Sequence, residues 1–189
     1  MRCFLAIELS ADVREQLGQL QKRLRALDRA VRWTRPDQIH LTLKFLGDVP
    51  DADVSSMCDA AAEVARRFPP FELRISGTGC FPPGGPARIV WVGIDGPPQP
   101  LVECHRACEE TYARLGFEPE GRAYTPHLTV GRVRDGHAPG EIRAAVQAEA
   151  QFSLGSVAVA ELVMFQSVLG PTGPTHTAIR RAPLGVSGG

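Results

Sequence analysis

The spacing of apolar residues along the chain switches between the period of strands and the period of helices. Continuous or alternating apolar runs predict strands, whereas apolar residues three or four positions apart predict helices with one buried face. Behind Ser10, whose hydroxyl suits a helix N-cap, such a stripe runs through Val13, Leu17, Leu20, Leu24 and Leu27. We expect strands at 3–9, 39–47, 71–77, 88–94, 127–133, twice within 152–169 and at 175–181, with helices after Ser10 and at 53–67, 100–115 and 141–149.

The predicted elements occur in the same order in the two halves of the chain. Each half has a helix, a strand that opens with His-Leu-Thr, a second helix and a pair of strands. This repeat predicts an α+β, bilobal duplicated fold, with two antiparallel sheets and outer helices around a pseudo-two-fold central cleft. We therefore expect residues 1–189 to form a single two-lobed catalytic domain, with motifs at 40–43 and 127–130 and a flexible tail at 186–189.

Two short stretches are predicted to be irregular. Residues 78–87 are so rich in Gly and Pro that they predict a loop between two strands. Pro36 indicates an extended or turning segment over 33–37, just before the first His-Leu-Thr strand.

Composition and charge limit the partners that this chain can have. Of its 189 residues, 43% are hydrophobic and 22% are charged, as in an ordinary globular protein. Basic and acidic residues both total 21, so an anion site has to be local and not part of a general basic field. No apolar run approaches the ~20 residues of a membrane span, and the five cysteines follow no small-scaffold pattern. We expect a cytoplasmic monomer with reduced thiols and no membrane partner.

The tripeptide His-Leu-Thr occurs twice, at His40 and again at His127. Alternate residues of a strand share a face, so Thr42 lies beside His40 and Thr129 beside His127, while each intervening leucine points into the core. A single copy of this tripeptide is a weak signal. Two copies at matching places in a duplicated chain predict that an imidazole and a hydroxyl from each lobe face one shared space.

Two imidazoles that face one substrate suit the hydrolysis of a phosphodiester. Histidine titrates near pH 6.5, so one ring can take a proton from water while the other gives a proton to the departing ribose oxygen. The hydroxyls of Thr42 and Thr129 can bond to the non-bridging phosphate oxygens, whose charge has to be stabilised in the transition state. This scheme needs no metal, and a strained five-membered cyclic phosphate suits it best.

Cationic and aromatic residues near the motifs are candidates for further substrate contacts. Lys44 lies four residues after His40, on the same predicted strand face, where it can bind phosphate. Arg132 lies five residues after His127, so strict alternation turns it away unless a bulge near Gly131 or a strand end redirects it. Three aromatic residues can stack on a base or pack in the core, and three further histidines are taken as surface or structural groups: Trp33, Phe81 and Tyr124, and His105, His137 and His176.

Several segments resemble the two-histidine phosphoesterase superfamily, and within it the RNA 2′,3′-cyclic phosphodiesterases, also called 2′-5′ RNA ligases. The segments are RCFLAIELS, RWTRPDQIHLTLKFLGDV, FPPGGPARIVWVGI and YTPHLTVGRV, and the resemblance extends over the full chain. It implies a bilobal fold and hydrolysis of RNA terminal 2′,3′-cyclic phosphate to a 2′-phosphate without a cofactor. It also implies that His40 is the proton donor, that His127 is the proton acceptor that activates water, and that Thr42, Thr129 and Arg132 contact the phosphate.

Other functions are compatible with the same residues. The site can also run in reverse, joining a ribose 5′-hydroxyl to a cyclic phosphate in a 2′-5′ linkage. The substrate can instead be a small cyclic nucleotide or an ADP-ribose cyclic phosphate, or the protein can be a non-catalytic module that grips RNA ends. A zinc site around Cys104, His105 and Cys108 is a further hypothesis, although a closed site needs four ligands and no second cluster follows.

Overall fold

The fold is taken from a computed structural model, which describes residues 1–134, 139–170 and 173–185. The strands are β1 (Arg2–Glu8), β2 (Val31–Trp33), β3 (His40–Asp48), β4 (Phe71–Phe81), β5 (Ile89–Ile94), β6 (His127–Val133), β7 (Ser153–Val159), β8 (Glu161–Gly170) and β9 (Gly173–Pro183). The α-helices are α1 (Ala11–Arg23), α2 (Val54–Ala65), α3 (Gln99–Arg114) and α4 (Pro139–Ala148), and short 3-10 helices cover Arg25–Leu27, Pro36–Gln38 and Asp51–Asp53. The tail expected at 186–189 and the histidine at position 137 lie outside the described residues.

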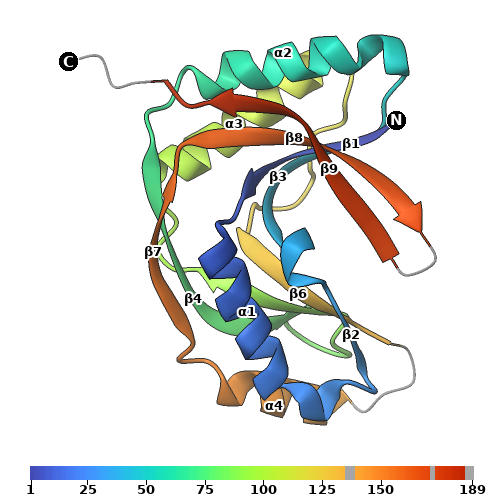
Figure 1. The fold of residues 1–189 in the computed structure, drawn as a ribbon, viewed down its shortest axis with the longest axis vertical. Coiled ribbons are helices and arrows are strands. Elements are labelled where there is room, and N and C mark those ends of the chain that lie inside the picture. The colour runs from blue at the N-terminus through green and yellow to red at the C-terminus, as the bar shows by residue number, and fades with distance from the viewer. Residues whose placement is uncertain (135–138, 171–172, 186–189) are drawn as a thin grey trace.

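The strands form one sheet, and every pairing within it is antiparallel. Over the described residues the order is β7-β4-β5-β6-β3-β1-β8-β9, with β2 paired to β6 at the side. The two antiparallel sheets expected from the repeat are the two halves of this single sheet, which curls through the molecule (Figure 1). They join where Leu41 of β3 pairs with Leu128 of β6. The expected α+β fold built from a duplicated unit is confirmed.

Each side of the sheet contains strands from both halves of the chain. β4 follows α2 in the first half of the sequence, yet it pairs with β5 on the β6 side of the join. β8 follows α4 in the second half, yet it pairs with β1 on the β3 side. In Figure 1 the orange strand β8 therefore runs beside the blue strand β1. This exchange makes the order of the six central strands, β4-β5-β6 and β8-β1-β3, symmetric about the join.

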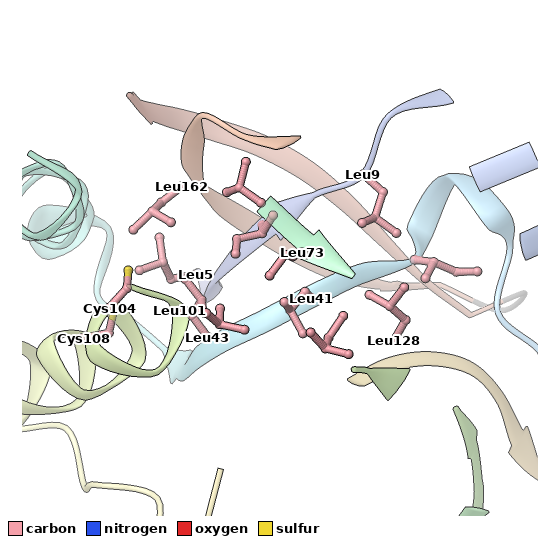
Figure 2. Close-up of a cluster of buried hydrophobic side chains, with 14 of the residues drawn as sticks. Leu5, Leu9, Leu41, Leu43, Leu73, Leu101, Cys104, Cys108, Leu128 and Leu162 are labelled. Atoms are coloured by element: carbon pink, nitrogen blue, oxygen red, sulfur yellow. The ribbon is translucent and has the colours of Figure 1, made fainter. Parts of the chain in front are cut away.

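One apolar core runs through both lobes. Figure 2 shows Leu41 and Leu128 in the same cluster as Leu73 of β4, and all three side chains are at most 1% exposed. Helices α2 and α3 pack together at one end of the molecule, while α1 and α4 lie at the other (Figure 1), where Arg23 pairs with Glu149. Burial of apolar side chains from both halves is the main favourable contribution to folding. None of the helices in the described part of the chain is long and apolar enough to cross a membrane.

The observed elements depart from the sequence-based expectation in three places. The loop predicted at 78–87 begins later, because β4 continues to Phe81, which pairs with Ile89 of β5. The apolar stripe of the first helix continues to Leu27, but the α-helix ends at Arg23 and a 3-10 turn follows. β2 is a true strand, since all three of its residues pair with β6.

We expect Gly131→Ala in β6 to destabilise the protein by about 1–3 kcal/mol, the usual range for overpacking in a core. A Cβ at this position would lie 2.5 Å from Cγ1 of the buried Val31 and 2.9 Å from Cε3 of Trp33, so these side chains would have to move. Gly121→Ala is the matched control, because a Cβ there meets no atom within 4 Å, and its effect should stay within about 0.5 kcal/mol. Urea denaturation of both variants measures the difference, and equal stabilities would contradict this packing.

Candidate active site

The two His-Leu-Thr motifs lie side by side at the join of the sheet. Antiparallel pairing of Leu41 with Leu128 sets a register in which His40 lies across from Thr129 and Thr42 lies across from His127. Because alternate residues point to opposite faces, these four side chains share one face while both leucines are buried on the other. We call the face that carries the two histidines and two threonines the motif face. The sequence-based prediction that the motifs face one space agrees with this register.

Each motif strand carries one extra residue immediately after its threonine. In β6, Gly131 pairs with Val90 and Thr129 with Trp91, so Val130 has no opposite residue. This bulge reverses the alternation of side chains, and Arg132, which pairs with Ile89, returns to the motif face. Arg132 can lie on the motif face only if the alternation of side chains is broken before it. That break is present, at Val130 rather than at Gly131.

The same bulge in β3 overturns the expected position of Lys44. Lys44 pairs with Leu5 and Thr42 with Ala6, so Leu43 is the extra residue. Lys44 consequently points to the opposite side from the motif face and is only 4% exposed. Its Nζ donates to Oε2 of Glu109 at 2.7 Å and to the carbonyl oxygen of Glu118 at 2.6 Å. The prediction that Lys44 shares a face with His40 was wrong, and Lys44 is a buried structural cation.

Phe45 occupies the position in β3 that Arg132 occupies in β6. It pairs with Phe4 one residue after Lys44, on the motif face, and its side chain is 67% exposed. Phe45 is absent from the candidates predicted from the sequence, because strict alternation assigns Lys44 rather than Phe45 to the side of His40. The duplication was the signal that could have found it, since the two segments HLTLKF and HLTVGR align Phe45 with Arg132.

Both motif histidines are held by the backbone two residues earlier. Nδ1 of His40 lies 2.8 Å from the carbonyl oxygen of Gln38, and Nδ1 of His127 lies 2.8 Å from that of Thr125. A carbonyl oxygen can only accept a hydrogen bond, so each Nδ1 carries the proton. Nε2 of each ring is then the atom that remains for chemistry, as acceptor in the neutral ring and as donor in the protonated ring.

The two rings differ in their surroundings. His40 stacks on Phe4 with ring centroids 4.6 Å apart, whereas His127 meets the edge of Phe81 at 4.9 Å. Burial, together with the charge that neighbouring His176 can carry, lowers the pKa of His40 from 6.5 to about 4. In the free protein His40 is therefore neutral at pH 7.

His176 is closer to the motif than the sequence analysis expected. Its ring centroid lies 5.2 Å from that of His40 in an edge-on arrangement, and its backbone N–H donates to Oε1 of Gln38 at 2.6 Å. Gln38 thus holds both histidines, through its carbonyl oxygen and its side chain. A cavity of about 80 Å³ adjoins these residues and is also lined by Glu8 and Arg14.

Of the three aromatic residues proposed for base stacking, only Phe81 lies on the motif face. Tyr124 is half-buried and packs against the ring of His105, at a centroid distance of 3.7 Å, and its hydroxyl donates to the carbonyl oxygen of Thr42. Trp33 lies over Gly131 on the other face and donates from Nε1 to Asp28. Tyr124 and Trp33 therefore support the motif strands from behind.

The zinc hypothesis is not supported. Cys104 and Cys108 are fully buried on α3, while the ring of His105 packs on Tyr124 and approaches Glu109 at 3.8 Å. Within residues 1–134, 139–170 and 173–185, no group of three or more His, Cys, Asp or Glu side chains is arranged to hold a metal ion. The two thiols are part of the apolar core.

Comparison with known proteins gives consistent matches over the whole chain. The model of the LigT-like phosphoesterase family matches twice, at residues 7–91 and 92–176. The RNA 2′,3′-cyclic phosphodiesterase of Methanothermobacter thermautotrophicus is 33% identical over 94% of this chain and 95% of its own length, and that of Archaeoglobus fulgidus is 31% identical over 95% and 98%. The crystal structure of TT0787 of Thermus thermophilus superposes with a TM-score of 0.85 at 26% identity over all of both chains. That of Escherichia coli LigT complexed with 3′-AMP gives 0.76 at 27% identity over 97% of both.

Each matched segment contains one His-Leu-Thr motif, so the duplication in the fold corresponds to two copies of one family unit. The fold and the paired motifs define a phosphoesterase with two histidines on one sheet. The chain belongs to the LigT-like phosphoesterase family. The expected resemblance and the expected enzyme class, a phosphodiesterase, are confirmed.

Replacement of Lys44 tests whether this residue is a buried structural cation. Lys44→Met removes the cation beside Glu109, whose side chain is only 14% exposed, and loss of one partner of a buried ion pair costs roughly 3–5 kcal/mol. Arg132→Gln is the control, because this exposed side chain should change the free energy of unfolding by less than about 0.5 kcal/mol. Urea denaturation measures both. If Lys44→Met leaves the stability unchanged but weakens phosphate binding, Lys44 is a substrate-binding residue and not a buried structural cation.

The low pKa of His40 predicts how NMR and stability respond to pH. In the free protein the ring should stay neutral and protonated on Nδ1 down to about pH 4, and added inorganic phosphate should raise this pKa because an anion favours the charged ring. Between pH 6.5 and 4 the unfolded chain takes up a proton that the folded His40 does not, so this residue makes stability fall with falling pH. A ¹⁵N titration assigned with His40→Asn measures the pKa. A free-protein value near 6.5 would contradict the buried geometry.

Proposed function

We propose that this protein hydrolyses RNA terminal 2′,3′-cyclic phosphate to a 2′-phosphate, using His40 and His127 as proton donor and acceptor and no metal or cofactor. The observation that carries the proposal is the register at the join, which sets each histidine across from the threonine of the other motif on one face. A phosphate held there would have an imidazole and a hydroxyl on each side. The names of the Methanothermobacter and Archaeoglobus relatives support the choice of substrate.

In the proposed reaction two protons move and one phosphorus–oxygen bond is exchanged for another. Neutral His127 accepts a proton from water at Nε2 while the water oxygen bonds to phosphorus. The bond from phosphorus to the 3′ oxygen breaks, and protonated His40 gives the proton on its Nε2 to that oxygen. The product is a 2′-phosphate beside a 3′-hydroxyl. Proton exchange with solvent then restores both rings for the next turnover.

The donor role requires His40 to gain a proton when substrate binds. Since burial keeps the free ring neutral at pH 7, the negative phosphate has to raise its pKa in the complex. The same phosphate would accept hydrogen bonds from Thr42, Thr129 and Arg132, all of which lie on the motif face. Assignment of His40 as donor rests on the family resemblance, whereas the shared face rests on the register.

The same site can support ligation and related substrates. If a ribose 5′-hydroxyl replaces water as the attacking group, the product is a 2′-5′ linkage. The leaving group is still the 3′ oxygen. A small cyclic nucleotide or an ADP-ribose cyclic phosphate presents the same reacting group as an RNA end. Escherichia coli LigT has been crystallised with 3′-AMP, with ATP and with NADP⁺, which supports a site in this family that admits free nucleotides.

Hydrolysis of a nucleoside 2′,3′-cyclic phosphate in excess chelator tests the proposal. We expect the wild-type rate to be unchanged by the chelator, and His40→Ala or His127→Ala to lower kcat by about 10²–10⁴, the range typical of one acid or base. Circular dichroism of both variants serves as the folding control. A rate that depends on added metal, or wild-type turnover by either variant, would refute the mechanism, and tight binding without turnover would instead indicate a non-catalytic RNA-end module.

A further inference from the structure

A second arginine lies directly opposite Arg132. β2 pairs with β6 beyond the segment that β3 covers, and its register matches Arg32 with Arg132 and Trp33 with Gly131. Directly opposite residues of an antiparallel pair point to the same face, so both guanidinium groups lie on the motif face. Their Cβ atoms are therefore neighbours, at the usual spacing of about 5 Å.

These two cations face each other without a compensating carboxylate in the part of the chain that the structure describes. Both side chains are exposed, and neither forms a hydrogen bond or an ion pair with residues 1–134, 139–170 or 173–185. Like charges directly opposite on a sheet repel each other. An anion bound beside them would remove that repulsion, and arginine is well suited to bind phosphate with two parallel hydrogen bonds.

The backbone that carries Arg32 is firmly held. Val31 is buried on the opposite face, Trp33 donates to Asp28 at 2.7 Å, and the backbone N–H of Thr34 donates to the carbonyl oxygen of Val130 at 3.0 Å. The side-chain amide of Gln21 donates to the same carbonyl oxygen at 2.9 Å, so the bulged residue Val130 has a fully hydrogen-bonded carbonyl group. The direction of Arg32 is therefore set by strand pairing and not by a mobile loop.

The pair of arginines is confined to one side of the site. At the pseudo-symmetric position in the other lobe, Arg132 is replaced by the aromatic Phe45. One end of the motif face thus presents two cations and the other an exposed aromatic ring. A ligand with a second phosphate is therefore favoured to extend toward the end that carries the two arginines.

We propose that Arg32 binds the phosphodiester that joins the terminal nucleotide to the rest of an RNA strand, while Arg132 serves the reacting cyclic phosphate. The inference rests on the proposed function and deepens it, because it makes an RNA strand a better substrate than a mononucleotide. Arg32 lies one strand, about 4.8 Å, beyond Arg132, so the two cations can contact successive phosphates.

Two substrates test the proposal, one without and one with an internucleotide phosphodiester. They are a nucleoside 2′,3′-cyclic phosphate with a free 5′-hydroxyl and a dinucleotide that ends in the same cyclic phosphate. Arg32→Gln should lower kcat/KM about tenfold for the dinucleotide, as expected for loss of one charge-assisted hydrogen bond, and less than about twofold for the mononucleotide. Arg32→Lys should recover part of the loss because it keeps the charge. Arg106→Gln, an exposed arginine on α3, is the control and should change neither value.

Binding of product-like ligands separates this proposal from the proposed function. For a dinucleotide with a terminal 2′-phosphate, the logarithm of the affinity should fall linearly with the logarithm of the salt concentration. Arg32→Gln should make this slope shallower by the amount expected for one lost phosphate contact. Equal losses on both substrates would place Arg32 at the reacting phosphate and overturn the inference, as would no loss on the dinucleotide. If wild type hydrolyses neither substrate, the proposed function fails, and the binding comparison alone then decides whether Arg32 holds a second phosphate.

Discussion

The pairing of Leu41 with Leu128 is the constraint on which the site depends. It bridges β3 and β6, and through them it joins the two halves of the sheet. Both leucines are buried in the common core, so a shift of either strand by one residue would expose a leucine and bury a histidine. The hydrophobic energy that forms the core therefore also fixes which residues lie on the motif face.

The duplicated framework supplies two similar positions, and their neighbours make them chemically different. After equivalent bulges, the buried position is Lys44 in one lobe and Gly131 in the other, and the exposed position is Phe45 or Arg132. His40 stacks on an aromatic ring and beside a second histidine, which accounts for its lowered pKa. A symmetric fold thus carries an asymmetric site, which suits the proposed reaction with one leaving group and one attacking group.

Much of the fold and the centre of the site could be read from the sequence, because they follow from regular periods. Apolar spacing predicted the helices, and the repeated tripeptide identified His40 and His127. The bulges were harder to predict, because a bulge depends on how two strands pair and has little signature in the sequence of either strand. Gly131 offered a hint beside Arg132, whereas Leu43 and Lys44 offered none, and Lys44 was therefore assigned to the wrong face. β2 was missed because three residues are too few to show a period.

The exchange of β4 and β8 has a consequence for how such a chain can arise. Neither matched repeat completes its own part of the sheet, because β1 of the first repeat pairs with β8 of the second, and β5, where the second repeat begins, pairs with β4 of the first. A polypeptide containing one repeat would leave those strand edges open until it met a second copy. The architecture resembles a strand-swapped homodimer in which the two copies are joined in one chain, and covalent linkage keeps the halves at high effective concentration. Because the two motif strands are encoded separately within one chain, one can carry an aromatic side chain, Phe45, at the position where the other carries Arg132.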